Sequence, residues 1–131
     1  MISILYADNN KDDREMMDDF FSQYPDLDLV RFSGGEMLID YVKSVDSDLV
    51  CYLVLDVDMR DLNGIDALKQ LRSLPITSKT KAMLLSYSIT EAEKQDAIAL
   101  NAELVSKPLT HEKVNEVGTL IVEYCYKYLA D

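Results

Sequence analysis

Short runs of apolar residues alternate along the chain with longer segments in which apolar residues recur at helical spacing. The apolar runs predict strands over residues 2–7, 27–32, 51–56, 81–86 and 103–106. The other segments predict helices over residues 11–23, after Ser33, over residues 64–73, from Thr90 to near residue 101, and over residues 110–130. Alternating strands and helices form a parallel sheet with right-handed crossovers and helices on both faces. The pattern therefore predicts a three-layer α/β fold, and we expect residues 1–131 to form one domain.

Two of the predicted helices begin with the pattern of a capping box, in which a Ser or Thr and a Glu three residues later satisfy free backbone N–H groups. Ser33 with Glu36 predicts one such start, and Thr90 with Glu93 predicts another. The last helix carries an apolar stripe that is typical of a helix packed on a sheet: Val114, Val117, Ile121, Tyr124 and Tyr128.

Composition and charge narrow the classes of function. Hydrophobic residues make up 48% of the chain, which argues against disorder. No apolar run approaches the roughly 18 residues of a membrane span, and the N-terminus lacks the pattern of a signal peptide, so we expect a cytoplasmic protein without a membrane partner. The net charge of -11 repels phosphate backbones, so we expect no nucleic-acid partner.

The cysteines and the acidic run of the first helix are interpreted as structural. Cys51 and Cys125 lie in apolar stretches without metal-type spacing, and we expect two separate buried thiols. We expect the first helix to expose four acidic residues to solvent: Asp12, Asp13, Asp18 and Asp19.

Polar residues stand where four of the predicted strands end: Asp8, Asp56, Ser86 and Lys107. Sites in open parallel sheets form at the carboxyl ends of the strands, so we expect these side chains to share one site. If the first and third strands are neighbours, the carboxylates of Asp8 and Asp56 lie roughly 5 Å apart. Two carboxylates at that distance repel each other unless a cation lies between them.

A hard divalent cation with oxygen ligands would relieve this repulsion. Mg²⁺ fits best, because it accepts a few carboxylates and carbonyls and leaves positions open for phosphate oxygens. Lys107 and the Ser86 hydroxyl would then complete a cage for a tetrahedral phosphoryl group. A carboxylate in that cage can attack phosphorus and form an acyl phosphate.

Four segments resemble the motifs of the response-regulator receiver domains of two-component signalling. They are ILYADNNKDDRE at residues 4–15, LVLDVDMRDLNGID at 53–66, LLSYS at 84–88 and VSKPL at 105–109. They occur in the family's order at the ends of the first, third, fourth and fifth strands, and the resemblance covers essentially the whole chain. It implies a flavodoxin-like (βα)5 fold with strand order 2-1-3-4-5, which periodicity alone does not establish.

The resemblance implies a stand-alone receiver rather than an enzyme. Asp56 would accept a phosphoryl group from a histidine kinase or a histidine phosphotransfer protein, and Ser86 and Lys107 would contact that group. The implied Mg²⁺ ligands are Asp8, Asn9, Asp56 and Asp58, the last through its backbone carbonyl. The signal would leave through a protein contact on the face of the fourth helix, fifth strand and fifth helix. Tyr126 is either ordinary surface or part of a docking or homodimer patch.

The sequence departs from the family at four positions. Asn9 stands where a second acid is usual, which lowers the expected Mg²⁺ affinity. Arg60 stands where Pro is common, and Tyr87 replaces a small residue and could crowd the phosphoryl site. Leu104 replaces the switching aromatic of many relatives, which puts the ring-rotation form of the switch in doubt.

Two other functions are consistent with parts of this pattern. The departures would permit a pseudo-receiver, an interaction module that works without phosphorylation, but the presence of Asp56, Ser86 and Lys107 together favours the phosphorylated form. The stretch LVLDVDMRD also resembles the nucleophile motif of haloacid-dehalogenase-type phosphatases. That family usually places this strand near its start and its metal-binding acids late, which is the reverse of the order here.

Overall fold

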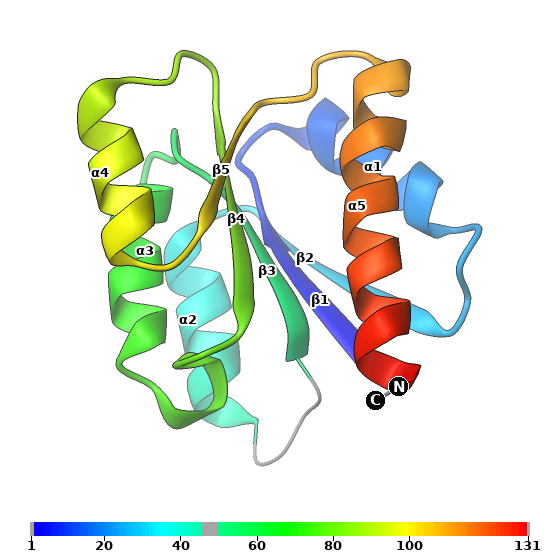
Figure 1. Cartoon of the computed structure of the whole chain (residues 1–131), viewed down its shortest axis with the longest axis horizontal. Helices are drawn as coiled ribbons and strands as arrows, with labels where there is room; N and C mark the ends of the chain where they lie inside the picture. Colours follow the sequence, from blue (N-terminus) through cyan, green and yellow to red (C-terminus); the bar gives the residue numbers. More distant parts are fainter. Residues whose placement is uncertain (1, 46–49, 131) are drawn as a thin grey trace.

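The sheet is parallel throughout, with strand order β2-β1-β3-β4-β5 (Figure 1). The computed structural model describes residues 2–45 and 50–130, with the backbone alone for residues 128–130. The strands are β1 (Ile2–Ala7), β2 (Leu27–Phe32), β3 (Val50–Asp56), β4 (Lys81–Ser86) and β5 (Glu103–Ser106). The helices are α1 (Lys11–Phe21), α2 (Gly35–Ser44), α3 (Gly64–Arg72), α4 (Glu91–Ala99) and α5 (His111–Ala130), with a short 3-10 helix η1 (Pro75–Thr77). This is the flavodoxin-like α/β fold, and the expected strand order is confirmed.

Helices cover both faces of the sheet, as the periodicity predicts. Figure 1 shows α1 and α5 on one face and α2, α3 and α4 on the other. Two apolar clusters fill the spaces between the sheet and these helix layers. All seven residues of β3 are buried, which explains why this strand reads as a continuous apolar run. Among the described helices, none combines the length and apolar character needed to cross a membrane.

The register of the strands brings their carboxyl ends to one edge of the sheet. Ala7 of β1 pairs with Leu55 of β3, so the residues that follow them, Asp8 and Asp56, are neighbours. On the other side of β3, Ser86 of β4 pairs with a residue of β5 that directly precedes Lys107. Backbone pairing alone therefore positions the polar residues that the sequence places at strand ends.

The start of α2 differs from the sequence prediction. The expected capping box of Ser33 and Glu36 is absent, and the N-cap residue is Gly34, which has no side chain to accept a hydrogen bond. The carboxylate of Asp61 replaces it and accepts hydrogen bonds from the backbone N–H groups of Gly35 (3.3 Å) and Glu36 (3.0 Å). A Cβ at Gly34 would lie 2.6 Å from an Asp61 oxygen, so this contact requires glycine. The second predicted capping box, at the start of α4, is confirmed.

The two cysteines form a disulfide, so the expectation of separate thiols was wrong. Cys51 lies near the start of β3 and Cys125 lies in α5, and their Cα atoms are 6.0 Å apart. Both residues are buried. They are 74 positions apart in the chain, so only the packing of α5 against the sheet reveals that they face each other.

Reduction of the Cys51–Cys125 disulfide should lower the free energy of unfolding by about 4 kcal/mol, because the bond removes loop-closure entropy from the unfolded chain. Urea unfolding followed by circular dichroism, with and without a reductant, measures this difference. A Cys125→Ala variant is the control, because reductant should not change its stability. Alkylation of both cysteines in denaturant without reductant would show that the bond is absent.

Candidate functional site

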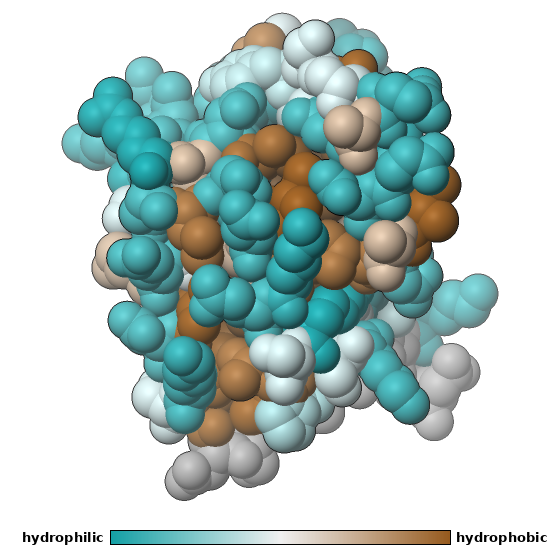
Figure 2. Space-filling model, turned by 90° about the vertical axis from the view of Figure 1, so that its left-hand side faces the viewer, coloured by the Kyte–Doolittle hydropathy of each residue, from teal (hydrophilic) through white to brown (hydrophobic). Residues whose placement is uncertain are grey.

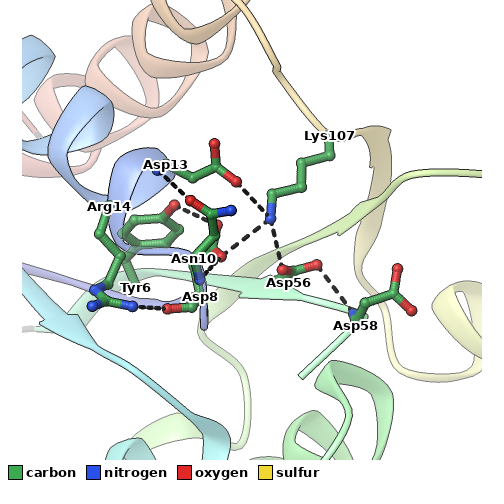
Figure 3. Close-up of polar contacts among 8 residues, drawn as sticks. All are labelled: Tyr6, Asp8, Asn10, Asp13, Arg14, Asp56, Asp58 and Lys107. Carbon is green, nitrogen blue, oxygen red and sulfur yellow. Dashed lines mark hydrogen bonds and ion pairs between the residues drawn. The ribbon is translucent and has the colours of Figure 1, made fainter. Parts of the chain in front are cut away.

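A buried lysine joins the two carboxylates that end β1 and β3. Lys107 Nζ donates hydrogen bonds to Asp56 Oδ2 at 2.8 Å and to Asp8 Oδ1 at 3.1 Å (Figure 3). The side chains of Asp8 and Asp56 are fully buried, and that of Lys107 is 1% exposed. The structure therefore brings three of the four expected residues together, and the cation between the two carboxylates is the lysine itself.

A third carboxylate, Asp13, belongs to the same cluster, so its expected exposure was wrong. Its Oδ2 atom lies 3.0 Å from Lys107 Nζ, and its side chain is 13% exposed. This contact is an ion pair without hydrogen-bond geometry, and Oδ2 is buried with no hydrogen-bond partner among the described residues. Asp13 reaches the site because α1 begins at the same sheet edge, with Asn10 as its N-cap accepting a hydrogen bond from the Asp13 N–H (3.0 Å).

Neighbouring donors hold Asp8 in place. The Tyr6 hydroxyl donates to Asp8 Oδ2 at 2.7 Å, and the backbone N–H of Asn10 donates to Asp8 Oδ1 at 2.9 Å. Arg14 donates to the Asp8 backbone carbonyl at 2.7 Å. Burial and the Asp8 charge raise the pKa of Tyr6, so its hydroxyl keeps its proton and stays a donor. In the sequence Tyr6 reads as one more apolar strand residue, which hides this role.

The other two predicted metal ligands lie at the rim of the cluster. Asn9 is exposed directly after Asp8. Asp58 is exposed as well, and its backbone N–H donates to Asp56 Oδ1 at 3.1 Å. Gly64 allows the loop that carries Asp58 to lie close to β3, because a Cβ there would collide with the Asp56 carbonyl.

Ser86 and Tyr87 lie on the β4 side of the site. Ser86 is buried, and its hydroxyl donates to Glu93 Oε1 of α4 at 2.7 Å. Tyr87 is 52% exposed, and Lys107 Nζ lies 4.7 Å from the centre of its ring, in the range of a cation–π contact. The tyrosine therefore contacts the site lysine while half of its surface faces solvent.

The cluster is rich in negative charge. Three carboxylates surround one ammonium group, which leaves a net charge of -2 when all are ionised. Burial raises the pKa of Asp56 to about 6, although its hydrogen bond from Lys107 opposes the shift. Burial alone would lower the pKa of Lys107, but its carboxylate partners, Asp56 first, raise it above its ordinary value. Lys107 is therefore charged at neutral pH, and Asp56 is mostly ionised.

The donor set matches a hard divalent cation in charge and in chemistry. Such ions take carboxylate and carbonyl oxygens as ligands, and an excess of two negative charges equals the charge of one Mg²⁺. Asp13 adds a buried oxygen to this donor set, and the one ammonium group that it contacts is shared with two other carboxylates. Within residues 2–45 and 50–130, no three acidic, histidine or cysteine side chains are grouped as a ready metal centre.

Comparison with known proteins decides the family. The sequence model of one protein family, described as the response regulator receiver domain, matches residues 4–117 of this chain. The chain belongs to the response regulator receiver domain family. Receiver domains are signalling domains and generally not enzymes. The receiver assignment therefore replaces the interpretation as a haloacid-dehalogenase-type phosphatase.

Solved structures share the fold over nearly the whole chain. The chemotaxis protein CheY4 of Vibrio cholerae, crystallised at low pH, has 17% identity and a TM-score of 0.77, with 92% of this chain and 98% of that chain covered. The phosphorylated cyanobacterial phytochrome response regulator RcpA has 16% identity and a TM-score of 0.81, with 93% and 91% covered. The Mn²⁺-bound form of the response regulator Rcp1 has 13% identity and a TM-score of 0.74, with 88% and 90% covered.

Replacing Asp56 with Asn should stabilise the metal-free receiver at neutral pH. The pKa of Asp56 rises from 3.8 to about 6 on folding, so the folded state binds this proton more tightly than the unfolded state. Ionisation of Asp56 therefore leaves the free energy of unfolding unchanged below about pH 4 and lowers it by up to about 3 kcal/mol above about pH 6. We expect the stability gained by Asp56→Asn to grow as the pH rises through this window.

Urea unfolding in the presence of a chelator, at several pH values across this window, measures the difference between variant and wild type. Asp58→Asn is the matched control, because it removes an exposed carboxylate from the same loop and should change the stability little. A constant difference for Asp56→Asn, or a loss of stability that grows with pH, would contradict the assignment of a raised pKa.

Proposed function

We propose that this chain is a phosphorylatable receiver in which Asp56 accepts a phosphoryl group from the phosphohistidine of a kinase or phosphotransfer protein. The observation that carries the proposal is the buried Lys107 ammonium, 2.8 Å from the Asp56 carboxylate in a member of the receiver family. An Asp56 oxygen would attack phosphorus as the bond from phosphorus to the histidine nitrogen breaks. The products are an aspartyl phosphate and a free imidazole, which takes up a proton.

The protein's own groups are suited to this transfer. Asp56, with a pKa of about 6, is mostly ionised at neutral pH and can act as the nucleophile. Lys107 keeps its charge and would pair with a phosphoryl oxygen after transfer. The hydroxyl of Ser86, at the end of the neighbouring strand, would donate to another oxygen. Beyond accepting and losing its own phosphoryl group, the protein would have no enzymatic activity.

We propose a Mg²⁺ site at the same cluster. Asp8 and Asp56 would supply carboxylates, Asn9 its side-chain amide and Asp58 its backbone carbonyl. The metal, when bound, would neutralise the carboxylates and the phosphoryl oxygens. The Mn²⁺-bound Rcp1 structure supports divalent-metal binding in this fold. Asp13 adds a carboxylate beside the site and would offset the charge that Asn9 lacks.

The signal would leave through a changed protein contact on the face of α4, β5 and α5. Figure 2 looks onto the side of the molecule where α3 and α4 lie, and not onto α5, and it shows apolar side chains exposed among hydrophilic ones there. Ile98 of α4 is 72% exposed, and Leu120 of α5 is 54% exposed. Tyr126, by contrast, donates a hydrogen bond to Asp26 at 2.9 Å and packs against the Tyr24 ring, so it is held within its own chain. This favours ordinary surface over a homodimer patch at Tyr126.

We also propose that the protein acts in the cytoplasm without contact to nucleic acid or membrane. Disulfides are rare in that compartment. The burial of Cys51 and Cys125 would limit the access of cellular reductants to their bond.

Incubation with acetyl phosphate and Mg²⁺ should add one phosphoryl group to the wild-type protein and none to Asp56→Asn, because the carboxylate is the nucleophile. Intact-protein mass spectrometry measures the gain, and a chelator should abolish it. A folded wild-type sample that gains no mass would contradict the proposal and support a pseudo-receiver. Steady release of inorganic phosphate without accumulation would point to phosphatase activity.

Replacing Asp13 with Asn should weaken Mg²⁺ binding roughly fivefold, because it removes a partly screened charge worth about 1 kcal/mol beside the site. Isothermal titration calorimetry with MgCl₂ measures the affinity. Asp12→Asn is the matched control, since it makes the same charge change on the neighbouring exposed residue. Equal weakening in both variants would show that only the overall charge matters.

A further inference from the structure

Helix α4 has little apolar packing to hold it. Ala97 is its one buried residue, and Ile98 is 72% exposed. Figure 1 shows α4 beside β5, at the end of the helix layer that it shares with α2 and α3. Most of its surface therefore faces solvent, and polar contacts at its two ends matter more than they do in the other helices.

Hydrogen bonds connect both ends of α4 to the rest of the protein. At the C-terminal end, Arg72 of α3 donates to the backbone carbonyls of Leu100 (3.0 Å) and Asn101 (3.3 Å). At the N-terminal end, Glu93 accepts the hydrogen bond from the buried Ser86 hydroxyl at 2.7 Å. The second contact leads directly to the site, because Ser86 ends the strand next to that of Asp56.

Glu93 has two functions in this arrangement. As the acidic member of the capping box, its Oε1 atom accepts a hydrogen bond from the backbone N–H of Thr90 at 3.3 Å. The same oxygen accepts the shorter bond from Ser86. A capping box needs only the first of these bonds, so the second is an addition that ties α4 to β4.

We propose that Glu93 is a positioning residue that holds the Ser86 hydroxyl on α4 until Asp56 is phosphorylated. This inference rests on the proposed phosphorylation of Asp56. A serine hydroxyl has one proton, so Ser86 can donate it to Glu93 or to a phosphoryl oxygen but not to both. The phosphoryl group and Glu93 therefore compete for one donor. Phosphorylation breaks the link between β4 and the N-terminal end of α4, while the capping box, the Ala97 contact and the Arg72 bonds remain.

Glu93→Ala should tighten the binding of beryllofluoride, a phosphoryl mimic that attaches to an aspartate carboxylate, because Ser86 no longer has to leave Glu93. The expected gain is roughly fivefold in affinity, which corresponds to one net hydrogen bond. The titration is followed in the presence of Mg²⁺ by the backbone amide signals of labelled protein in NMR spectra. Glu93→Gln keeps the capping box and removes the charge, so it should give a smaller gain in the same direction even if the alanine variant folds poorly.

The double variant Ser86→Ala/Glu93→Ala separates this role from a general effect of charge. Without the hydroxyl, removal of Glu93 should not change the affinity for beryllofluoride. Glu91→Ala is the matched charge control, since Glu91 is an exposed acid in the same helical turn, and it should leave the affinity unchanged. Thr90→Ala removes the other half of the capping box and should also leave it unchanged.

Equal gains with and without the Ser86 hydroxyl, or an equal gain in Glu91→Ala or Thr90→Ala, would overturn the proposal in favour of charge or helix capping. Unchanged affinity in Glu93→Ala, when wild type binds and Asp56→Asn does not, would overturn it while leaving the phosphorylation of Asp56 intact. Failure of wild type to bind at all would reject the phosphoacceptor role of Asp56, and this proposal with it.

Discussion

One ammonium group shared by three carboxylates is the interaction on which the site depends. Lys107 lies between the fully buried carboxylates of Asp8 and Asp56 and contacts Asp13 as well. Desolvated charges of one sign are costly, and a single lysine neutralises only part of this cluster. The remaining negative charge makes the site receptive to a divalent cation. It also keeps the lysine charged and close to the carboxylate that would carry the phosphoryl group.

Backbone pairing alone brings the two fully buried carboxylates of this cluster together. Neighbouring parallel strands end at one edge, so Asp8 and Asp56 meet without any loop having to be ordered around them. Other residues then adapt the cluster to this chain. Tyr6 occupies one oxygen of Asp8 from within the strand, and Asp13 brings a carboxylate from the first turn of α1. The charge that Asn9 does not supply is thus present nearby, on a different element.

The sequence predicts local features well and contacts between distant segments poorly. Hydrophobic periodicity is enough for the alternation of strands and helices, and the capping box of Thr90 and Glu93 is correct because both residues belong to one helical turn. The box at Ser33 fails because the cap comes from Asp61, which only the folded chain brings near. The pairing of Cys51 with Cys125 depends in the same way on how α5 packs.

The same contrast between local features and contacts of distant segments applies to the candidate site. Its members at strand ends are visible in the sequence, because each apolar run stops abruptly at a polar residue. Asp13 is missed because its spacing suits an exposed helical face, and only the direction in which α1 leaves the sheet turns it toward Lys107. The bond from Ser86 to Glu93 is missed because Glu93 already has a sufficient local function in its capping box.

The identity of the phosphorylated residue is the most direct test of this interpretation. The protein is first treated with acetyl phosphate and Mg²⁺, and sodium borohydride then reduces any aspartyl phosphate to homoserine. Tandem mass spectrometry locates the homoserine in the sequence. We expect homoserine at position 56 alone, because Asp56 is the carboxylate closest to the Lys107 ammonium at 2.8 Å. Homoserine at the position of Asp8 or Asp13, or a stable phosphate on the Ser86 hydroxyl, would contradict the assignment of Asp56 as the phosphoacceptor.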